Sequence, residues 1–135
     1  MIKKMEYDDI LDIRKKVLWP KRDHDFVKMP FDESEHILHI GLTDDLDIIN
    51  VVSLDFKHNS MQICQLATVH KFQGKGYGKK LMKHIFNIAE NRNIQKIWCN
   101  SRKEKCGFYS KYGLNKTGET YIRYGREIFQ MELNL

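Results

Sequence analysis

Apolar residues recur at helical spacing in two separate stretches of the chain. The first set follows Asp8 and Asp9 and ends before Pro20, and its members are Ile10, Leu11, Ile13, Val17 and Leu18. The second set begins after Tyr77 and ends near Asn91, and it comprises Leu81, Met82, Ile85, Phe86, Ile88 and Ala89. Each set forms one broad apolar face, so each stretch predicts an amphipathic helix that packs on a sheet.

The remaining apolar stretches are rich in β-branched residues or alternate with polar ones, which predicts strands. They cover residues 36–42, 47–56, 61–69, 94–100, 115–123 and 126–133. The four residues between the first two predict a hairpin turn, and a short helix is expected over 104–112. Residues 21–35 are polar and contain Pro30, which predicts a long loop with room for a short helical piece. Loops of this length are often functional, so we mark this one as a candidate lid or acceptor segment.

The expected strand over 61–69 is interrupted in its alternation. Met61 and Ile63 keep a period of two, Gln65 breaks it, and Ala67 and Val69 resume it. A β-bulge has this effect, although a single polar residue on a core face would look the same. The order strand, helix, strand over 61–100 predicts a right-handed parallel crossover.

Length and composition limit the possible classes. A chain of 135 residues has the size of one domain, and we expect residues 1–135 to form a single one. The net charge of +5 is modest, and acidic residues are interspersed with basic ones, so charge alone does not imply nucleic acid. We find no signal-peptide pattern and no apolar run of membrane-spanning length, so a cytoplasmic protein without a membrane partner is expected. Cys64, Cys99 and Cys106 lack a Cys-x-x-Cys pair, which favours buried or half-buried free thiols over disulfides or a metal site.

Three glycines mark the turn before the second helix. Gly74, Gly76 and Gly78 remove side chains there, so backbone N–H groups can approach a bound group closely. The start of the helix adds unpaired N–H donors and the positive end of its dipole, which suits a phosphate or pyrophosphate. The residues do not form a Walker loop, because Lys80 stands where Ser or Thr is required, nor the dinucleotide fingerprint, because the spacing is Gly-x-Gly-x-Gly. A turn without a ligand is the alternative.

Lysines gather beside this turn. Lys75, Lys79 and Lys83 lie four residues apart and share one helix face, with Lys71 and Lys80 close by in the sequence. A solvated face is the common explanation of such a stripe, and a face that meets a polyanionic ligand is the functional one. We favour the second because the stripe begins at the glycine turn.

Two short motifs resemble a known family. Gln73, Gly76 and Gly78 fit Gln/Arg-x-x-Gly-x-Gly/Ala, which is similar to the pyrophosphate-binding signature of the GNAT superfamily of acetyl-CoA-dependent N-acetyltransferases. The segment Phe108-Tyr109-Ser110-Lys111-Tyr112-Gly113-Leu114 resembles that superfamily's Phe-Tyr-x-x-x-Gly-Phe, with Leu114 in place of the last phenylalanine. The order of the expected elements is also similar, over nearly the whole chain.

The resemblance extends to small bacterial members of mostly undefined substrate. It rests on Ile13-Arg14, Val17-Leu18-Trp19-Pro20, Phe31-Asp32, His39, and Cys99-Asn100-Ser101-Arg102. Such proteins often carry a Pro-His pair shortly before the final methionine, whereas this chain reads Glu127-Ile128-Phe129-Gln130-Met131. No role for that histidine can be transferred.

The resemblance implies an α/β fold of a particular kind. Its central sheet is mixed and largely antiparallel, a parallel central strand pair splays at a bulge, and helices cover both faces. The implied activity is acyl transfer, from acetyl-CoA as cosubstrate to a primary amine of a small molecule or peptide, without a metal. Two alternatives stay open: a domain of the same fold that binds CoA without catalysis, and a weaker one, an RNA-binding module with Tyr77 as a stacking residue. The chain is expected to be a monomer or a homodimer.

The resemblance also implies roles for individual residues. The pantetheine arm would bind along Leu66, Ala67, Thr68 and Val69, and the pyrophosphate at Gln73, Gly74, Lys75, Gly76, Tyr77, Gly78 and Lys79. A backbone N–H near Ala67 would polarise the thioester carbonyl. Tyr109 would protonate the departing thiolate, as a phenol within hydrogen-bond reach can.

Four polar residues are candidates for the acceptor side. We expect Arg14, Asp32, His39 and Arg102 to converge there, because each lies in a matching segment where the local pattern would tolerate an apolar residue. Two arginines would suit an acceptor with a carboxylate or phosphate beside its amine. In the alternative, Arg14 is solvated on its helix and Arg102 pairs with an acid such as Glu104.

The base that deprotonates the acceptor has several candidates, which are Asp32, Glu35, His36, His39 and Asp55. For each histidine an ordinary strand or rim position is the better explanation. A water chain can also serve as the base and would leave no trace in the sequence.

Overall fold

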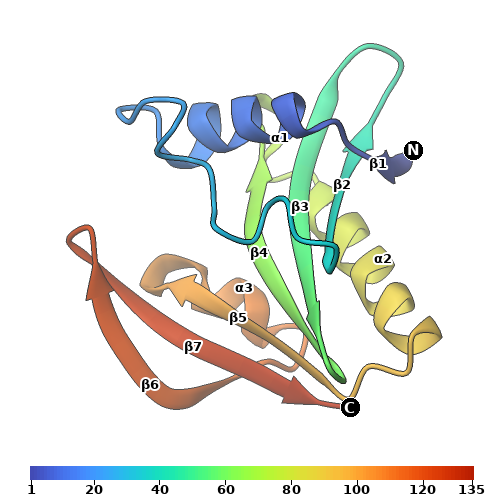
Figure 1. Cartoon of the computed structure of the whole chain (residues 1–135), viewed down its shortest axis with the longest axis vertical. Coiled ribbons are helices and arrows are strands. Elements are labelled where there is room, and N and C mark those ends of the chain that lie inside the picture. Colours follow the sequence, from blue (N-terminus) through green and yellow to red (C-terminus); the bar gives the residue numbers. More distant parts are fainter.

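A single seven-stranded sheet forms the centre of the computed structural model, which describes residues 1–135 (Figure 1). The strand order is β1-β2-β3-β4-β5-β7-β6, and only β4 and β5 are parallel neighbours. The strands are β1 (Ile2–Lys4), β2 (Ile37–Thr43), β3 (Ile48–Lys57), β4 (Ser60–Thr68), β5 (Lys96–Arg102), β6 (Asn115–Arg123) and β7 (Arg126–Asn134). The expected mixed and largely antiparallel sheet is therefore confirmed.

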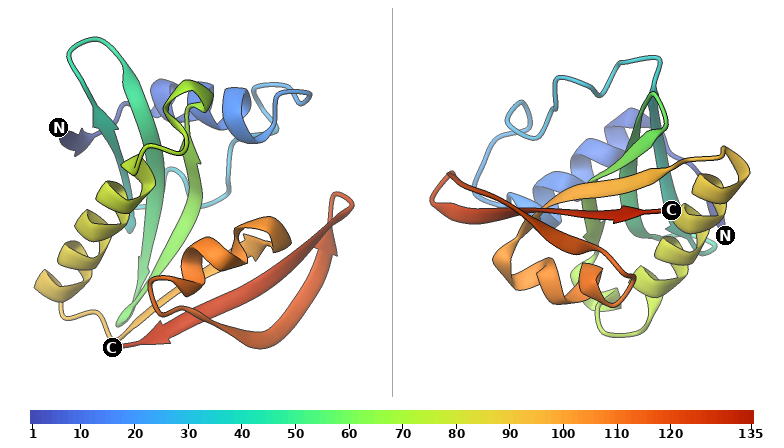
Figure 2. Two further views of the ribbon diagram at one scale, coloured as in Figure 1. Left: turned by 180° about the vertical axis from the view of Figure 1, so that it is seen from behind. Right: turned by 90° about the horizontal axis from the view of Figure 1, so that it is seen from below.

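Helices cover both faces of this sheet (Figure 2). Helix α1 (Tyr7–Ile13) continues into a π-helical turn (Arg14–Leu18) and packs on one face, and α2 (Tyr77–Asn91) packs on the other beside α3 (Cys106–Ser110). The apolar faces explain this arrangement. Leu81 and Ile85 of α2 are fully buried in the main core, while Ile10 of α1 belongs to a second, smaller core.

A β-bulge interrupts the pairing of β3 with β4. Val51 faces Ala67 and Ser53 faces Cys64, so two residues of β4 stand opposite Val52 alone. Gln65 takes a left-handed backbone conformation, with φ 53°. The bulge predicted at the broken alternation is thus confirmed, and the extra residue bends and twists the strand there.

The parallel pairing of β4 with β5 is short. It runs from Ser60 opposite Lys96 to Ile63 opposite Cys99 and then stops, although β4 continues to Thr68 and β5 to Arg102. Beyond this point β4 stays paired with β3, and β5 stays paired with β7. The two strands diverge in Figure 1, and the predicted splay of the central pair is confirmed.

The main differences from the sequence-based expectations concern β1, the loop over 21–35 and β5, and the short helix expected over 104–112 is limited to a 3-10 turn (Lys103–Lys105) and α3. Strand β1 was not expected, because three residues are too few to show an alternation. The loop over 21–35 contains only turns and no helix. Strand β5 begins and ends two residues later than predicted, because the N–H of Ile94 donates to the carbonyl of Ala89 and so belongs to the end of α2.

Gly41 on β2 provides a test of the packing between β1, β2 and β3. A Cβ atom at this position would lie 2.7 Å from the backbone oxygen of Asn50 and 2.9 Å from the side chain of Met5. We expect Gly41→Ala to lower the free energy of unfolding by roughly 1–3 kcal/mol, the usual cost of overpacking, as measured by urea denaturation.

Gly107 is the control for this prediction. A Cβ there meets no atom within 4 Å, and the residue lies in α3, where alanine is the better helix former. Gly107→Ala is expected to keep or slightly raise the stability. Equal losses of stability in both variants would contradict the close contact between Gly41 and the backbone oxygen of Asn50.

Candidate functional site

The glycine turn leads directly into α2. Gly76 is the N-cap residue of the helix and has φ 86°, and no side chain caps the first turn. The loop is held at its ends, since Gln73 Nε2 donates to the Thr68 carbonyl at 2.9 Å and Asn50 Nδ2 donates to the Tyr77 carbonyl at 3.1 Å. The first N–H groups of α2 therefore point outward without side-chain partners, which is the arrangement that binds anions.

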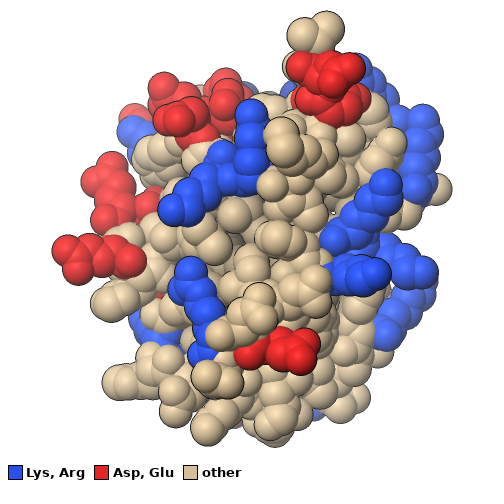
Figure 3. Space-filling model, turned by 90° about the vertical axis from the view of Figure 1, so that its right-hand side faces the viewer, with Lys and Arg blue, Asp and Glu red and all other residues tan.

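Basic side chains surround this turn. Lys75, Lys79, Lys80 and Lys83 are exposed, and none of them forms an ion pair. Lys71 is the exception, because its Nζ lies 3.6 Å from a carboxylate oxygen of Asp47. In Figure 3 blue side chains gather along the right-hand side of the molecule, where α2 runs, and the acidic side chains form separate groups. The lysine stripe is thus free to meet an anion.

The end of β4 lies between the bulge and the glycine turn. Ala67 is buried under α1, whereas Leu66 packs into the main core on the opposite face. Ala67 and Thr68 pair with β3, and none of the residues 66–68 pairs with β5. The inner edge of β4 therefore offers backbone groups to an extended ligand at this point.

Tyr109 lies on α3 and is only 8% exposed. Burial raises the pKa of its phenol, the thiols of Cys99 and Cys64 raise it further, and the charge of Arg102 opposes them. The phenol is therefore fully protonated near neutral pH. Its neighbours on β4 and β5 place it where these two strands diverge.

All three cysteines are free and buried, as expected. Burial raises the pKa of the Cys99 thiol to about 12 and also raises that of Cys64. Nucleophilic reactions of cysteine proceed through the thiolate, so these two thiols are inert at neutral pH.

Arg14 occupies the face of the sheet opposite α2 and is fully buried. Its guanidinium donates to both carboxylate oxygens of Asp32, at 2.7 and 2.9 Å. It also donates to Ser53 Oγ at 2.9 Å and to the Val27 carbonyl at 3.0 Å. The alternative of a solvated Arg14 is therefore wrong. Its hydrogen bonds connect the N-terminal helix to the loop over 21–35 and to β3.

Asp32 is the second centre of the same network. It also accepts hydrogen bonds from Tyr7 Oη and from the Met29 N–H, both at 2.8 Å. Burial alone would raise the pKa of Asp32, but the hydrogen bonds from Arg14 and Met29 and the Arg14 charge hold it below its usual value. Burial and the bond to Asp32 in turn raise the pKa of Tyr7.

His39 completes the network. Its Nδ1 lies 2.6 Å from Ser53 Oγ, its Nε2 lies 3.0 Å from the Asp32 carbonyl oxygen, and its ring stacks on Tyr7. Arg14, Asp32 and His39 thus converge, as the sequence predicts. Their polar atoms are engaged with one another, with the exception of Arg14 Nε.

Arg102 does not belong to this network. It lies at the end of β5 and forms no ion pair, and the titratable groups that act on it are Arg126, Glu104 and the Tyr109 phenol. The expected group of four is therefore divided into a closed set of three and a separate arginine. The sequence analysis missed Arg126, which acts on Arg102 from the neighbouring strand β7.

The candidate bases have different surroundings. Glu35 and His36 are exposed on the loop before β2, and Asp32 and His39 belong to the closed network. Asp55 on β3 is only 4% exposed, and its side chain makes no hydrogen bond or ion pair within the protein. Its charge reaches the Cys64 thiol, which lies on the neighbouring strand β4.

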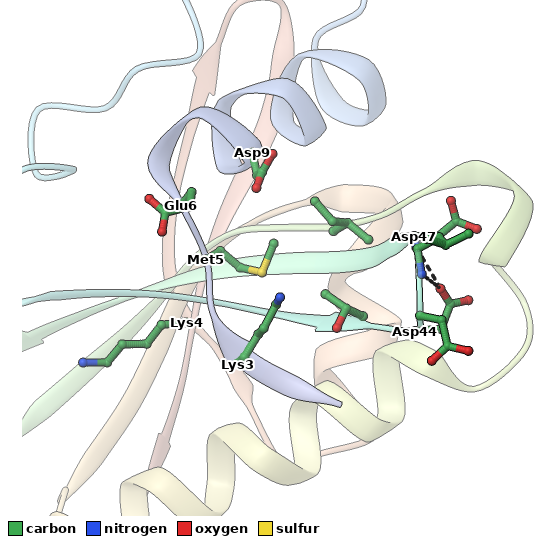
Figure 4. A pocket seen from close by; sticks show the side chains of 11 residues that line it. Lys3, Lys4, Met5, Glu6, Asp9, Asp44 and Asp47 are labelled. Carbon is green, nitrogen blue, oxygen red and sulfur yellow. Dashed lines mark hydrogen bonds between the residues drawn. The ribbon is translucent and has the colours of Figure 1, made fainter.

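A depression of about 190 Å³ lies between β1 and the β2–β3 hairpin. Figure 4 shows the side chains that line it. Its wall includes Lys3, Lys4 and several acidic residues. Asp44 stabilises the hairpin turn, because its carboxylate accepts the N–H groups of Leu46 and Asp47 at 3.2 and 2.8 Å. We therefore explain the acidic wall of this depression by the structure of the hairpin turn.

Two general features of the chain bear on its chemistry. No helix has both the length and the apolar character that are required to cross a membrane. No group of three or more His, Cys, Asp or Glu side chains is arranged to hold a metal ion.

Comparison with known proteins identifies relatives of this arrangement. Residues 21–135 match the family model described as acetyltransferase (GNAT) domain. The protein named uncharacterized N-acetyltransferase YitI, from Bacillus subtilis, is 27% identical over 129 residues, which cover 89% of this chain and 85% of the relative.

Solved structures with low sequence identity share the fold. The ribosomal-protein-S18-alanine N-acetyltransferase of Escherichia coli superposes with a TM-score of 0.83 at 16% identity, over 99% of this chain and 92% of its own. A GNAT family acetyltransferase from Elizabethkingia anophelis with acetyl-CoA bound has a TM-score of 0.75 at 17% identity, over 100% of this chain and 97% of its own.

Replacement of Arg14 tests whether its network is structural. Arg14→Met leaves the Asp32 carboxylate buried without its partner, which typically costs about 3–5 kcal/mol. We expect a loss of this size in the free energy of unfolding at pH 7, measured by urea denaturation. Lys16→Met, an exposed change on the same helical turn, is the control and should cost little.

The pH dependence of stability supplies a second readout of the same variant. In the native protein the Asp32 pKa is lowered, so its contribution is complete above the unfolded value near 3.8 and is lost as the pH falls through the lower folded value. In Arg14→Met burial is opposed only by the hydrogen bonds from Met29 and Tyr7, so the pKa of Asp32 should rise and the carboxyl should take up a proton at higher pH. The difference in the free energy of unfolding between the native protein and Arg14→Met should therefore become smaller from pH 7 to pH 5. A small difference in the free energy of unfolding that does not change with pH would mean that the network is not structural.

Proposed function

This chain belongs to the GNAT acetyltransferase family, and we propose that it transfers the acetyl group of acetyl-CoA to a primary amine of a small molecule or peptide. The observation that carries the proposal is the short parallel pairing of β4 and β5. It ends at Ile63 and Cys99, just before the bulge at Gln65. The unpaired edge of β4 beyond the bulge leads straight to the glycine turn, so an extended donor can lie along it.

The donor would be held largely by backbone groups. The amides of the pantetheine arm would pair with the edge of β4 over 66–69, in the manner of an added strand. The pyrophosphate would rest on the N–H groups of 73–79, helped by the free lysines beside α2. The residues present fit this use, because the first turn of α2 lacks a side-chain cap and Gly76 leaves the approach open.

The chemical step needs a proton donor for the leaving thiolate. The amine nitrogen attacks the thioester carbon, a backbone N–H near Ala67 stabilises the oxyanion, and the carbon–sulfur bond then breaks. We assign the proton that the sulfur receives to the Tyr109 phenol, whose raised pKa keeps it protonated until that moment. The proton lost by the amine passes to water, or to the buried carboxylate of Asp55, whose charge reaches Cys64 on β4.

Binding of CoA without catalysis is the competing explanation. Both explanations expect CoA to bind, so binding alone does not separate them. The decisive measurement is the release of thiol when acetyl-CoA is mixed with a panel of amines, because a purely binding domain releases none.

Gly76→Ala tests the donor site. CoA should raise the melting temperature of the native protein, since a ligand at 100 times its Kd adds about 2.7 kcal/mol of stability. In Gly76→Ala the new methyl group enters the open approach and strains a residue with φ 86°, so we expect CoA affinity to fall by roughly tenfold or more.

Gly118→Ala is the matched control for this test. Gly118 also has a positive φ, of 98°, and a Cβ there meets nothing within 4 Å, but it lies on β6. The two variants should lose similar stability, and only Gly76→Ala should lose CoA affinity. No thermal shift of the native protein at millimolar CoA would overturn the proposed donor site.

Tyr109→Phe tests the proton donor. General acid catalysis typically contributes about 10²–10⁴-fold, and we expect kcat to fall by a factor in this range while CoA affinity stays unchanged. Tyr112→Phe is the control, since its half-exposed ring packs on Phe108 just after α3. Equal kcat values for the native protein and Tyr109→Phe would mean that water protonates the thiolate.

A further inference from the structure

A cavity of about 480 Å³ lies between the end of the N-terminal helix and the β6–β7 hairpin. Its wall combines aromatic and basic side chains and contains no acidic residue. Trp19 and Tyr124 form apolar walls, and Lys21, Arg22 and Arg126 supply positive charge. An anion can therefore enter this cavity without meeting a like charge.

Arg126 is the most unusual member of this wall. Its guanidinium carbon lies 4.5 Å from the centre of the Trp19 ring, so the group is stacked and its orientation is fixed. Its Nη1 atom is buried and has no hydrogen-bond partner. A buried donor without a partner is costly, and an oxyanion bound in the cavity would remove that cost.

Arg102 stands beside Arg126 on the neighbouring strand. It pairs across the ladder with Ile128, and Arg126 lies two residues from Ile128, so both arginines project from the same face of the sheet. Neither forms an ion pair. Burial lowers the pKa of Arg102, and the charge of Arg126 lowers it further. Two guanidinium groups that lie near each other and form no ion pair are stabilised by an anion placed between them.

The cavity adjoins the proposed reaction centre. Trp19 Nε1 lies 3.4 Å from the side-chain oxygen of Gln65, and Gln65 is the bulge residue at which β4 turns away from β5. From the other side, Arg102 acts on the phenol of Tyr109. A molecule that occupies the cavity therefore lies next to the point at which the thioester would be attacked.

We propose that this cavity binds an oxyanion on the acceptor itself, so that the substrate is an amine that also carries a carboxylate or phosphate group. The inference rests on the proposed acetyl transfer and narrows its acceptor class. Arg126 in the cavity wall binds the anionic group, Arg102 on the neighbouring strand adds positive charge beside it, and the aromatic walls take up the apolar part of the molecule. The same charges repel polycationic amines.

Matched acceptor pairs test the proposal. Thiol release from acetyl-CoA is measured with an α-amino acid and its amide, with glucosamine 6-phosphate and glucosamine, and with spermidine. We expect the anionic member of at least one pair to have the higher kcat/KM, by roughly 10- to 100-fold, which is the range of charged hydrogen bonds. The pair that shows the preference distinguishes a carboxylate from a phosphate. A neutral amine or spermidine as the best substrate would overturn the proposal.

Two arginine variants test whether Arg126 causes the preference for an anionic acceptor. Arg126→Met should raise the KM of the anionic acceptor and remove the preference, while the KM of acetyl-CoA and the thermal shift by CoA stay unchanged. Arg92→Met is the matched control, because Arg92 is also stacked, 4.1 Å from the centre of the Phe56 ring, but lies just beyond α2. An unchanged preference in Arg126→Met would overturn the assignment to this cavity.

A binding measurement covers the case in which no amine of the panel reacts. Inorganic phosphate is added to the CoA-loaded protein at constant ionic strength, so that the donor site is already occupied. The native protein and Arg92→Met should gain thermal stability, and Arg126→Met should gain none. No gain in the native protein would overturn the anion site. The proposed function itself fails only if CoA does not bind or if no amine releases thiol.

Discussion

The parallel pairing of β4 with β5 ends after four residue pairs, and the rest of the structure depends on where it ends. The bulge at Gln65 adds one residue to β4 and turns it away, while β3 and β7 keep the two separated strand ends in place. Backbone groups on the inner edges are then left without partners, which is costly unless water or a ligand supplies them. A donor with amide groups along its length is the complement of such an edge. The glycine turn follows directly, so the same divergence would fix the position of the pyrophosphate in the proposed donor site.

Two arginines, Arg14 and Arg126, show that the surroundings of a residue decide its role. Arg14 is buried with an aspartate, a serine and a backbone carbonyl around it, and it holds the long loop and α1 to the sheet. Arg126 forms no ion pair, and its buried Nη1 atom has no hydrogen-bond partner. The first arrangement is complete and stabilises the fold. The second leaves a buried donor without a partner in the free protein. A ligand that supplies this partner gains binding energy from it.

The sequence predicts those structural features that depend on local patterns of apolar and polar residues. Helix α2 begins at Tyr77 and ends at Asn91, as its apolar face indicates, and the broken alternation at Gln65 marks the bulge. The three-residue β1 leaves no such pattern. Contacts between distant segments are predicted only in part: the matching segments bring Arg14 and Asp32 together but do not show that the two form an ion pair, and nothing near Trp19 in the sequence points to Arg126. The expected group of four acceptor residues was therefore divided, because membership of a matching segment does not show which side chains meet.

The two halves of the proposed site differ in how strongly they depend on side chains. The donor half is built from a bulge, a strand edge and the start of a helix, which many sequences can form, and structures with 16–17% identity superpose with TM-scores of 0.75–0.83. The acceptor half is built from side chains of a loop and a hairpin, segments whose residues can change with little cost to the fold. Shared architecture therefore supports the acetyl donor but says little about the acceptor. The choice of acceptor has to be argued from the charges of this chain itself, and those charges favour an anionic amine.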